Sequence, residues 1–360
     1  MKQATIYYLA FQQLGIGYRA LFGLLERLTS IEHAWNASRD ELVETGASSL
    51  FIERFMAERR TIDPDALFSS TRIPGMDLLT VVDPRYPTLL KETHSPPLVL
   101  FVRGNVDVLN ARCCAVVGTR KPTPYGIAAT HRIAEPLAHQ GIVIVSGLAY
   151  GIDAEAHRAA LEADGRTIAV LGNAIDEVYP RSHAPLARSI IDHGGAVISE
   201  YPPKTEVQKH FFPQRNRIIA GLSTASLIVE AGRRSGALIT AKMALDENRG
   251  VFAVPGPIDA ETSDGTNDLL RQGASIATRA DDLFEAFMLD TAPVLRNTVA
   301  IRAETPEEAR LLPLLAATRH IDELVAMSTL DTSVVNATLS LLEMKGRVRH
   351  VGGMHYIRIN

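Results

Sequence analysis

The stretch IVIVSGLAYGIDAEAHRAALEADGRTIAVLG, residues 142–172, decides the fold. It begins and ends with apolar runs rich in β-branched residues, IVIVSG (142–147) and TIAVLG (167–172), and each run closes with a glycine. Between them, DAEAHRAALEAD (153–164) is a helical candidate. Strands that are apolar on both faces and separated by helices are typical of a parallel sheet that helices cover on both sides.

The same alternation extends from about residue 75 to about residue 290. Further apolar runs are LLTVV (78–82), CCAVVG (113–118), AVISE (196–200), ASLIVEA (225–231) and VFAVPG (251–256). A second helical candidate, GALITAKMALDENRG (236–250), lies between the last two runs. The sequence therefore predicts an α/β protein with a Rossmann-like, doubly wound parallel sheet over residues 75–290.

Two smaller domains are expected beside the sheet. Residues 1–70 are predicted to form short helices, and the Gly15-Ile16-Gly17 turn is similar to that of a helix-hairpin-helix or SAM-like module. Such a module binds DNA backbone or another protein, and a plain packing domain is the alternative. Residues 305–360 give three helical stretches and a hairpin through Gly352-Gly353, a pattern typical of a winged helix.

The expected winged helix carries little sign of duplex recognition. Residues 306–360 hold six acidic and six basic side chains, and the would-be recognition helix has Asn336 but no arginine or lysine before Lys345. Reading of the major groove uses Arg, Lys, Asn or Gln in the N-terminal half of that helix. A protein contact or domain packing is therefore favoured over specific duplex recognition.

The composition sets limits on location and cofactors. The chain has 360 residues, 46% hydrophobic and 22% charged, and a formal net charge of −4, which indicates a globular protein with at most a local basic groove. No apolar run approaches the about 18 residues that cross a bilayer, and no cleavage site follows the N-terminus, so a cytoplasmic protein without a membrane partner is predicted. Cys113 and Cys114 are expected to be reduced, buried thiols, and no metal-binding spacing is present.

The chemistry is expected where the strands end. Five of the seven apolar runs lead through a glycine turn towards a helix start, as in VVGTRKPTPYG (116–126) and EAGRRSGALITA (230–241). In a parallel sheet these turns gather at the carboxyl edge, where helix N-termini favour anions, above all phosphates. The GxGxxG and GxxxxGK[ST] fingerprints are absent from the sequence, so no tightly held NAD or ATP, and no other cofactor, is predicted.

Basic and aromatic residues converge on the same edge. Arg120, Lys121 and Arg233 lie on the turns, and PKTEVQKHFFPQRNR (203–217) carries four basic residues against Glu206. A positive groove with exposed rings suits a single-stranded nucleic acid, because cations follow the phosphates while an aromatic ring stacks on a base. At most one of the two adjacent rings, Phe211 and Phe212, is expected to stack in this way, and the other is expected to belong to the core. The apolar residues behind them, Ile218, Ile219 and Leu222, are expected to anchor the helix.

Several single residues have simple structural interpretations. Asp153 is predicted to cap a helix, and His157 to make a structural hydrogen bond. Asp176 and Tyr179 are expected to shape their turn. Glu200 and Glu230 close their strands at positions where catalytic acids often lie. Ser235, Gly236 and Thr240 resemble a phosphate-binding helix start.

Together these blocks resemble the DNA-processing protein A family, also called DprA or Smf. The blocks are VVGTRKPTPYG, SGLAYGIDAEAHRAAL, VLGNAIDEVYP, SEYPP, FPQRNRIIAGLS, EAGRRSGALITAKMALDENR, VFAVPG and GTNDLLRQGA, in that order over residues 75–285. The resemblance implies a protein without catalytic activity that binds incoming single-stranded DNA during natural transformation, shields it from nucleases and loads RecA recombinase onto it. It also implies a homodimer formed through the Rossmann-like domain.

The resemblance also implies positions for the DNA contacts. The family's G-[ST]-R turn falls on Arg120, its FPxRNR block on Phe212 to Arg217, and its SGxLITA block on Ser235 to Ala241. The stretch RSHAPLA (181–187) departs from the family pattern, and Arg181 is taken as the substitute contact. The full expected site is Gly118, Thr119, Arg120, Lys121, Gly147, Arg181, Lys209, Phe211, Phe212, Arg215, Asn216, Arg217, Arg233, Ser235, Gly236 and Thr240.

Two other functions compete with this interpretation. A nucleotide or nucleoside phosphoribohydrolase would use the same sheet edge, but its reaction needs a carboxylate after the glycine turn, and Arg233, Arg234 and Thr240 stand there instead. A transcription regulator would read duplex DNA through the winged helix. The equal numbers of acidic and basic residues in that segment argue against this function.

Overall fold

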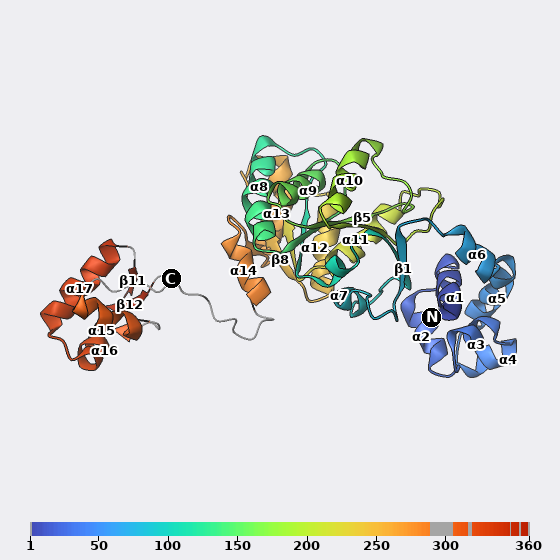
Figure 1. Cartoon of the computed structure of the whole chain (residues 1–360), viewed down its shortest axis with the longest axis horizontal. Helices are drawn as coiled ribbons and strands as arrows, with labels where there is room; N and C mark the ends of the chain where they lie inside the picture. The colour runs from blue at the N-terminus through green and yellow to red at the C-terminus, as the bar shows by residue number, and fades with distance from the viewer. Residues whose placement is uncertain (1, 289–304, 316–318, 346, 353, 359–360) are drawn as a thin grey trace. The chain divides into compact units, whose positions relative to one another are not determined.

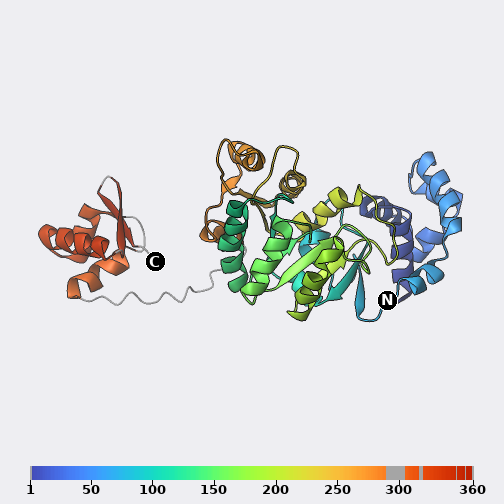
Figure 2. The same ribbon diagram turned by 90° about the horizontal axis from the view of Figure 1, so that it is seen from above.

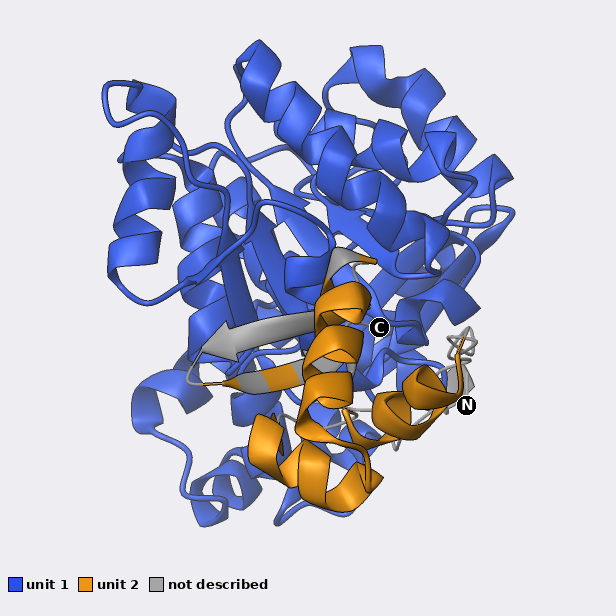
Figure 3. Cartoon of the chain, turned by 90° about the vertical axis from the view of Figure 1, so that its left-hand side faces the viewer, with its two compact units in different colours: residues 1–290 blue, residues 291–360 orange. Residues whose placement is uncertain are grey.

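The computed structural model describes residues 2–288, 305–315, 319–345, 347–352 and 354–358. The chain divides into two compact units, residues 1–290 and 291–360, which Figure 3 shows in different colours. The boundary expected near residue 70 lies inside the first unit, so a separate N-terminal domain stays a prediction. Residues 291–304, on which the second expected boundary falls, lie outside the described residues.

The first unit begins with short helices packed around aromatic rings. Phe11 stacks on Phe55 with ring centroids 5.5 Å apart, and the edge of Trp35 meets Phe11 at 5.3 Å. Gln12 hydrogen-bonds the backbone of Val99, so these helices are attached to the adjacent sheet (Figure 2). The helices are α1 (Lys2–Gln13), α2 (Tyr18–Leu25), α3 (Ile31–Asn36), α4 (Arg39–Glu44), α5 (Ser49–Glu58) and α6 (Pro64–Ser70).

A nine-stranded sheet forms the centre of this unit, and it confirms the α/β prediction. The order is β1-β2-β6-β5-β4-β3-β7-β8-β9, and the strands from β6 to β9 in this order are parallel. The chain builds outward from β3 through β4, β5 and β6, then returns to the other side of β3 with β7. The strands are β1 (Met76–Thr80), β2 (Val99–Gly104), β3 (Cys113–Val117), β4 (Val143–Ser146), β5 (Thr167–Leu171), β6 (Ala196–Ser199), β7 (Ala225–Ile228), β8 (Gly250–Ala253) and β9 (Ser275–Ile276).

One edge of the sheet differs from the expectation of parallel strands throughout. Strand β2 was not predicted, and it pairs antiparallel with both β1 and β6. The predicted run LLTVV therefore forms an antiparallel edge strand. The short strand β9 was not predicted either. An apolar run shows that a strand is buried, but it does not show the direction of the neighbouring strand.

Helices cover both faces of the sheet (Figure 1). Helices α8, α9 and α14 pack on one face together with Cys114, whereas α11 and α12 pack on the other together with Cys113. Both thiols are free and fully buried, as predicted from their alternation along a strand. The helices are α7 (Thr88–Lys91), α8 (Pro124–His139), α9 (Ile152–Glu162), α10 (Ala184–Asp192), α11 (Phe211–Gly221), α12 (Gly236–Asp246), α13 (Asp264–Arg271) and α14 (Asp281–Met288).

The second unit has the elements of a winged helix. Helices α15 (Pro306–Leu314), α16 (Ile321–Ser328) and α17 (Thr332–Met344) accompany a sheet of order β10-β12-β11. The strands are β10 (Arg319–His320), β11 (Val348–Gly352) and β12 (His355–Arg358). The predicted hairpin is confirmed, because β11 and β12 pair antiparallel, while Gly353 lies outside the described residues. Lys345 is paired with the buried carboxylate of Glu308 at 2.8 Å.

Within the described part of the chain, no single helix has the length and apolar character needed to cross a membrane. Helices Ile321–Ser328 and Thr332–Glu343 meet that test only as a pair, with a bend of 115° between them. Both helices supply buried side chains, among them Leu324 and Leu339, to the core of the second unit.

Candidate nucleic-acid interface

A pocket of about 760 Å³ lies at the carboxyl edge of the parallel strands. Its walls come from the turns after β3, β4, β5 and β7 and from the first two turns of α11. The reversal of strand order beside β3 places the turns after β3 and β7 next to each other, and ligands of open α/β sheets bind at such a point. We call it the sheet-edge pocket. Its lining includes Gly118, Thr119, Arg120, Asp153, Lys209, Phe212, Arg215, Asn216, Gly232, Arg233, Arg234, Ser235, Gly236 and Thr240.

The pocket carries an excess of exposed positive charge. The side chains of Arg120, Lys209, Arg233 and Arg234 are all exposed. Arg233 contacts Asp264 at 3.1 Å, but its side chain stays 76% exposed, so water screens this pair strongly. The cations come from three separate segments of the chain, as the sequence predicted, and they surround one cavity.

The start of α12 forms one wall of the pocket. Ser235 is the N-cap residue, and its hydroxyl accepts a hydrogen bond from the N–H of Ala237 at 3.3 Å. A Cβ added to Gly236 would meet no atom within 4 Å, so the backbone there is open to the cavity. The N–H groups of Ala237 and Leu238 are paired with Ser235, and the positive end of the helix dipole favours an anion at this wall.

Arg215 lies in the floor of the pocket and not on its rim. Its side chain is buried, with 5% exposure, and it donates to Gly147 O at 2.8 Å and to Val170 O. Burial lowers the pKa of Arg215 to about 10, while the charge of Asp153 acts in the opposite direction. The expectation that this arginine extends along a DNA backbone is therefore not met. The guanidinium instead connects the turn after β4 to strand β5.

Asp153 does not cap its helix, contrary to prediction. Helix α9 begins at Ile152, and the cap residue is Gly151, whose φ of 79° favours glycine. The Asp153 carboxylate accepts from Gly147 N at 3.1 Å and is buried. Burial raises the pKa of this carboxyl, and the charge of Arg215 partly offsets the effect.

The two adjacent phenylalanines point into different cavities. Phe212 lines the sheet-edge pocket, lies 5.5 Å from the ring of Tyr179 and packs against Gly172. Phe211 lines a second pocket, and Arg217 lies beside it, paired with Glu200 at 2.5 Å. Arg217 therefore lies outside the sheet-edge pocket and Glu200 neutralises its charge, whereas the sequence predicted it in one positive groove with the other cations.

Three further predicted residues do not line the sheet-edge pocket. Arg181 is paired with Glu177 at 3.0 Å, and its side chain is 88% exposed. Lys121 is exposed on the turn after β3, where its N–H donates to Thr119 Oγ1. Gly147 lies directly behind the pocket, and a Cβ there would overlap the Arg215 guanidinium.

Comparisons with known proteins identify a family whose model covers all the residues that line this pocket. The family model for DNA recombination-mediator protein A matches residues 77–288, and the one for the DprA winged helix domain matches residues 296–354. The chain belongs to the DprA/Smf family. Protein Smf of Synechocystis sp. is 36% identical over 391 residues, and the match covers 98% of this chain and 98% of that protein.

Two solved DprA structures resemble this chain. The X-ray structure of DprA from Streptococcus pneumoniae matches with a TM-score of 0.62 at 38% identity, over 69% of this chain and 85% of that one. DprA from Helicobacter pylori, solved for its single-stranded DNA binding mode, gives a TM-score of 0.54 at 29% identity, over 62% of this chain and 99% of that one. The resemblance inferred from the sequence blocks is thereby confirmed, as is the fold.

The remaining residues singled out in this DprA/Smf sequence have structural roles. His157 contacts Thr167 Oγ1 at 2.6 Å, and burial lowers the pKa of His157 to about 3. Glu230 is buried and accepts from Thr123 N at 2.9 Å, which holds the start of α8. Asp176 accepts from Lys204 N at 3.1 Å, consistent with its predicted role in shaping the turn. Ile218, Ile219 and Leu222 are buried, as predicted.

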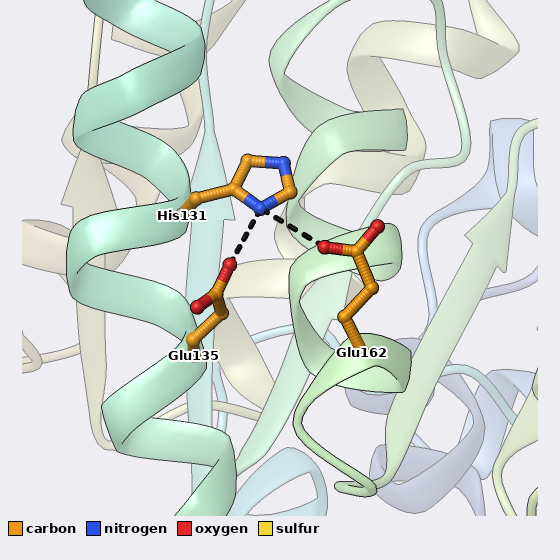
Figure 4. A group of neighbouring side chains, drawn as sticks. All are labelled: His131, Glu135 and Glu162. Carbon is orange, nitrogen blue, oxygen red and sulfur yellow. Dashed lines mark hydrogen bonds and ion pairs between the residues drawn. The ribbon is translucent and has the colours of Figure 1, made fainter.

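Sequence reasoning missed one charged cluster of this DprA/Smf protein, drawn in Figure 4. His131 Nδ1 on α8 lies 2.7 Å from Glu135 and 3.4 Å from Glu162 on α9, and His131 Nε2 lies 3.3 Å from Glu155. Burial of the ring disfavours its charged form, but the hydrogen bonds to Glu135 and Glu155 outweigh this and raise the pKa of His131. The spacing of His131 and Glu135, one helical turn, was the available signal. The ion pairs join α8 to α9 away from the sheet-edge pocket.

Proposed function

We propose that this chain binds single-stranded DNA in the sheet-edge pocket and takes part in DNA processing during natural transformation. The observation that carries the proposal is the gathering of Arg120, Lys209, Arg233 and Arg234 around one cavity that also contains the ring of Phe212. The Helicobacter pylori relative is described as binding single-stranded DNA, and this supports the choice of ligand.

The geometry suits a single strand better than a small nucleotide. Cations on three separate segments hold successive phosphates, and the open start of α12 adds the positive end of its dipole for one of them. Phe212 offers its ring to one base, and base stacking tolerates any sequence. The predicted contacts at Gly118, Thr119, Asn216, Ser235 and Thr240 belong to the same proposal, because these residues line the cavity.

The proposal includes the finer expectations that follow from the family. The chain acts without catalysis, protects the bound strand, presents it to RecA recombinase, and works as a homodimer in the cytoplasm. Membership of the DprA/Smf family supports these points.

The phosphoribohydrolase alternative finds little support in the pocket. Among its lining residues, all within the described chain, Asp153 is the sole carboxylate, and it is buried against Gly147 N. Glu230 holds the start of α8, and Glu200 is paired with Arg217. A base-release assay with nucleoside monophosphates tests the alternative directly, and steady release of base would favour the enzyme.

The test of the proposal is a titration of fluorescent single-stranded and double-stranded oligonucleotides at two salt concentrations. We expect Arg120→Glu to weaken single-strand binding by about tenfold or more, since a hydrogen bond to a charged group is worth about 1.5–3 kcal/mol. The magnitude of the log-log salt slope should fall by about 0.7 for each phosphate that the variant no longer neutralises. Arg60→Glu is the matched control, because this exposed arginine lines neither pocket, and it should bind as wild type. Wild-type affinity in the Arg120→Glu variant, or equal affinity for duplex, would overturn the proposal.

A further inference from the structure

A second cavity of about 590 Å³ lies between the N-terminal helices and the sheet. Its walls are α1, the Gly15-Ile16-Gly17 turn before α2, residues 95–98 and the segment 200–217. We call it the N-terminal pocket. Phe211 and Arg217, both expected DNA contacts, lie here, but the DNA site proposed above is confined to the sheet-edge pocket.

Helix α11 separates the two pockets. Its residues Phe211, Gln214 and Arg217 line the N-terminal pocket, whereas Phe212 and Asn216 line the sheet-edge pocket. The residues just before the helix alternate in the same way, with Lys209 in the sheet-edge pocket and Gln208 and His210 in the N-terminal pocket. A DNA strand that leaves the sheet-edge pocket across the exposed start of α11 therefore enters the N-terminal pocket.

Three rings contact one another in the N-terminal pocket, and two of them are stacked. The rings of Tyr201 and Phe211 stack with centroids 3.9 Å apart and an interplanar angle of 20°. The edge of His210 meets Phe211 at 4.7 Å. Tyr201 donates its hydroxyl proton to Gln214 Oε1 at 3.2 Å, which fixes the ring. Tyr201 and Phe211 are half-buried, so part of their ring surface stays accessible.

The charges of this pocket do not favour a phosphate. Arg217, its arginine, is paired with Glu200 at 2.5 Å and also donates to Ser95 O at 2.8 Å. The polar groups that remain exposed include the amides of Gln13, Gln208 and Gln214. Amide side chains offer both donors and acceptors, the groups that a nucleobase edge requires.

We propose that the N-terminal pocket is a nucleobase subsite for the same DNA strand, with the Tyr201–Phe211 stack as its platform. The inference rests on the proposed binding of single-stranded DNA to the sheet-edge pocket. The strand crosses the start of α11 near Lys209 and His210, and its next base stacks in the N-terminal pocket. The N-terminal helices thereby form one wall of the DNA path. If the rings only pack the two parts of the unit together, no base contacts them.

The test combines a variant, a control and a modified ligand. Phe211→Leu keeps apolar contact with Tyr201 but removes the ring, and we expect it to weaken binding of a long oligo-dT by about 5- to 150-fold, the range for one stacked base. The salt slope should not change, because every phosphate contact stays in place. Tyr125→Leu is the control, since this exposed ring lines neither pocket. An oligonucleotide that is abasic at the stacked position should bind both variants and the wild type alike.

A second measurement does not depend on any variant. An oligonucleotide with 5-iodouracil at successive positions, irradiated on the wild-type protein, should crosslink from one position to Tyr201 or Phe211, as mapped by mass spectrometry. If Arg120→Glu weakens binding while Phe211→Leu does not, and no crosslink reaches these rings, the subsite is refuted and the main site stands. If Arg120→Glu binds as wild type, the proposed function itself fails.

Discussion

The guanidinium of Arg215 packs directly against the backbone of Gly147, and each holds the other in position. Arg215 Nη1 donates to Gly147 O at 2.8 Å, and a Cβ on Gly147 would overlap the guanidinium. The N–H of the same glycine donates to Asp153 Oδ2 at 3.1 Å. The buried side chains of Arg215 and Asp153 thus both hydrogen-bond Gly147 and hold the turn after β4, and this turn supports the floor of the sheet-edge pocket.

Gly147→Ala should therefore destabilise the protein and weaken DNA binding together. Inserting a methyl group where the guanidinium lies forces a shift, and overpacking of this kind costs about 1–3 kcal/mol in the free energy of unfolding. Urea unfolding measures this destabilisation. Gly23→Ala in α2 is the control, because a Cβ there meets no atom within 4 Å and alanine favours a helix. An unchanged midpoint in Gly147→Ala would show that the turn adapts without cost.

Replacing Arg217 should affect stability more than DNA electrostatics. Its charge is neutralised by Glu200 in the N-terminal pocket, so Arg217→Met should leave the salt slope of single-strand binding unchanged. Removing the hydrogen bonds to Glu200 and Ser95 should lower the free energy of unfolding by about 1–3 kcal/mol. In urea unfolding, Glu200→Gln in the same chain should recover part of this stability, as partners in one ion pair are not additive. A smaller salt slope would place Arg217 on the phosphate backbone after all.

Much of the fold could be predicted because the apolar character of a segment shows by itself that the strand is buried. The runs around Val145 and Val170 are apolar throughout, and only a sheet covered on both faces buries such strands. The glycine turns after them had to meet at one edge, so the grouping of Arg120 with Arg233 also followed from the sequence.

The burial and the contact partners of individual side chains could not be predicted in the same way. Arg215 and Arg217 are two residues apart on one helix, and the sequence treats them alike. The structure buries the first against Gly147 and Val170 and pairs the second with Glu200, contacts made by residues distant in the chain. Helix α9 likewise begins one residue before the expected cap, because Gly151 adopts the backbone conformation that starts the helix.

His157 should make the protein sensitive to acid. Thr167 Oγ1 donates to Ile144 O, so His157 Nδ1 donates its proton to Thr167 Oγ1, and the buried ring is neutral. Burial lowers the pKa of His157 to about 3, whereas an unfolded histidine titrates near pH 6.5. The unfolded state therefore takes up the proton first, and stability is lost as the pH falls from about 6.5 towards 3. Between pH 7 and pH 5, wild type should lose about 2 kcal/mol more than His157→Gln in urea unfolding. Equal losses would contradict the buried neutral ring.

His131 should have the opposite pH dependence. Its pKa is raised in the folded state because hydrogen bonds to Glu135 and Glu155, with the charge of Glu162, outweigh burial of the ring. The folded state then holds the proton more tightly, so the stabilisation is fully present below about pH 6.5 and is lost as the pH rises through the raised pKa. Arg158, paired with Glu155, competes for one of these carboxylates, and each exposed pair contributes less than about 1 kcal/mol. The difference in melting temperature between wild type and His131→Gln should therefore be small, largest at pH 6 and reduced at pH 9 and in 1 M salt. His193→Gln is the control, because the His193 ring contacts the backbone carbonyl of Ser189. A difference that grows with rising pH would mean that the ring is neutral in the folded protein.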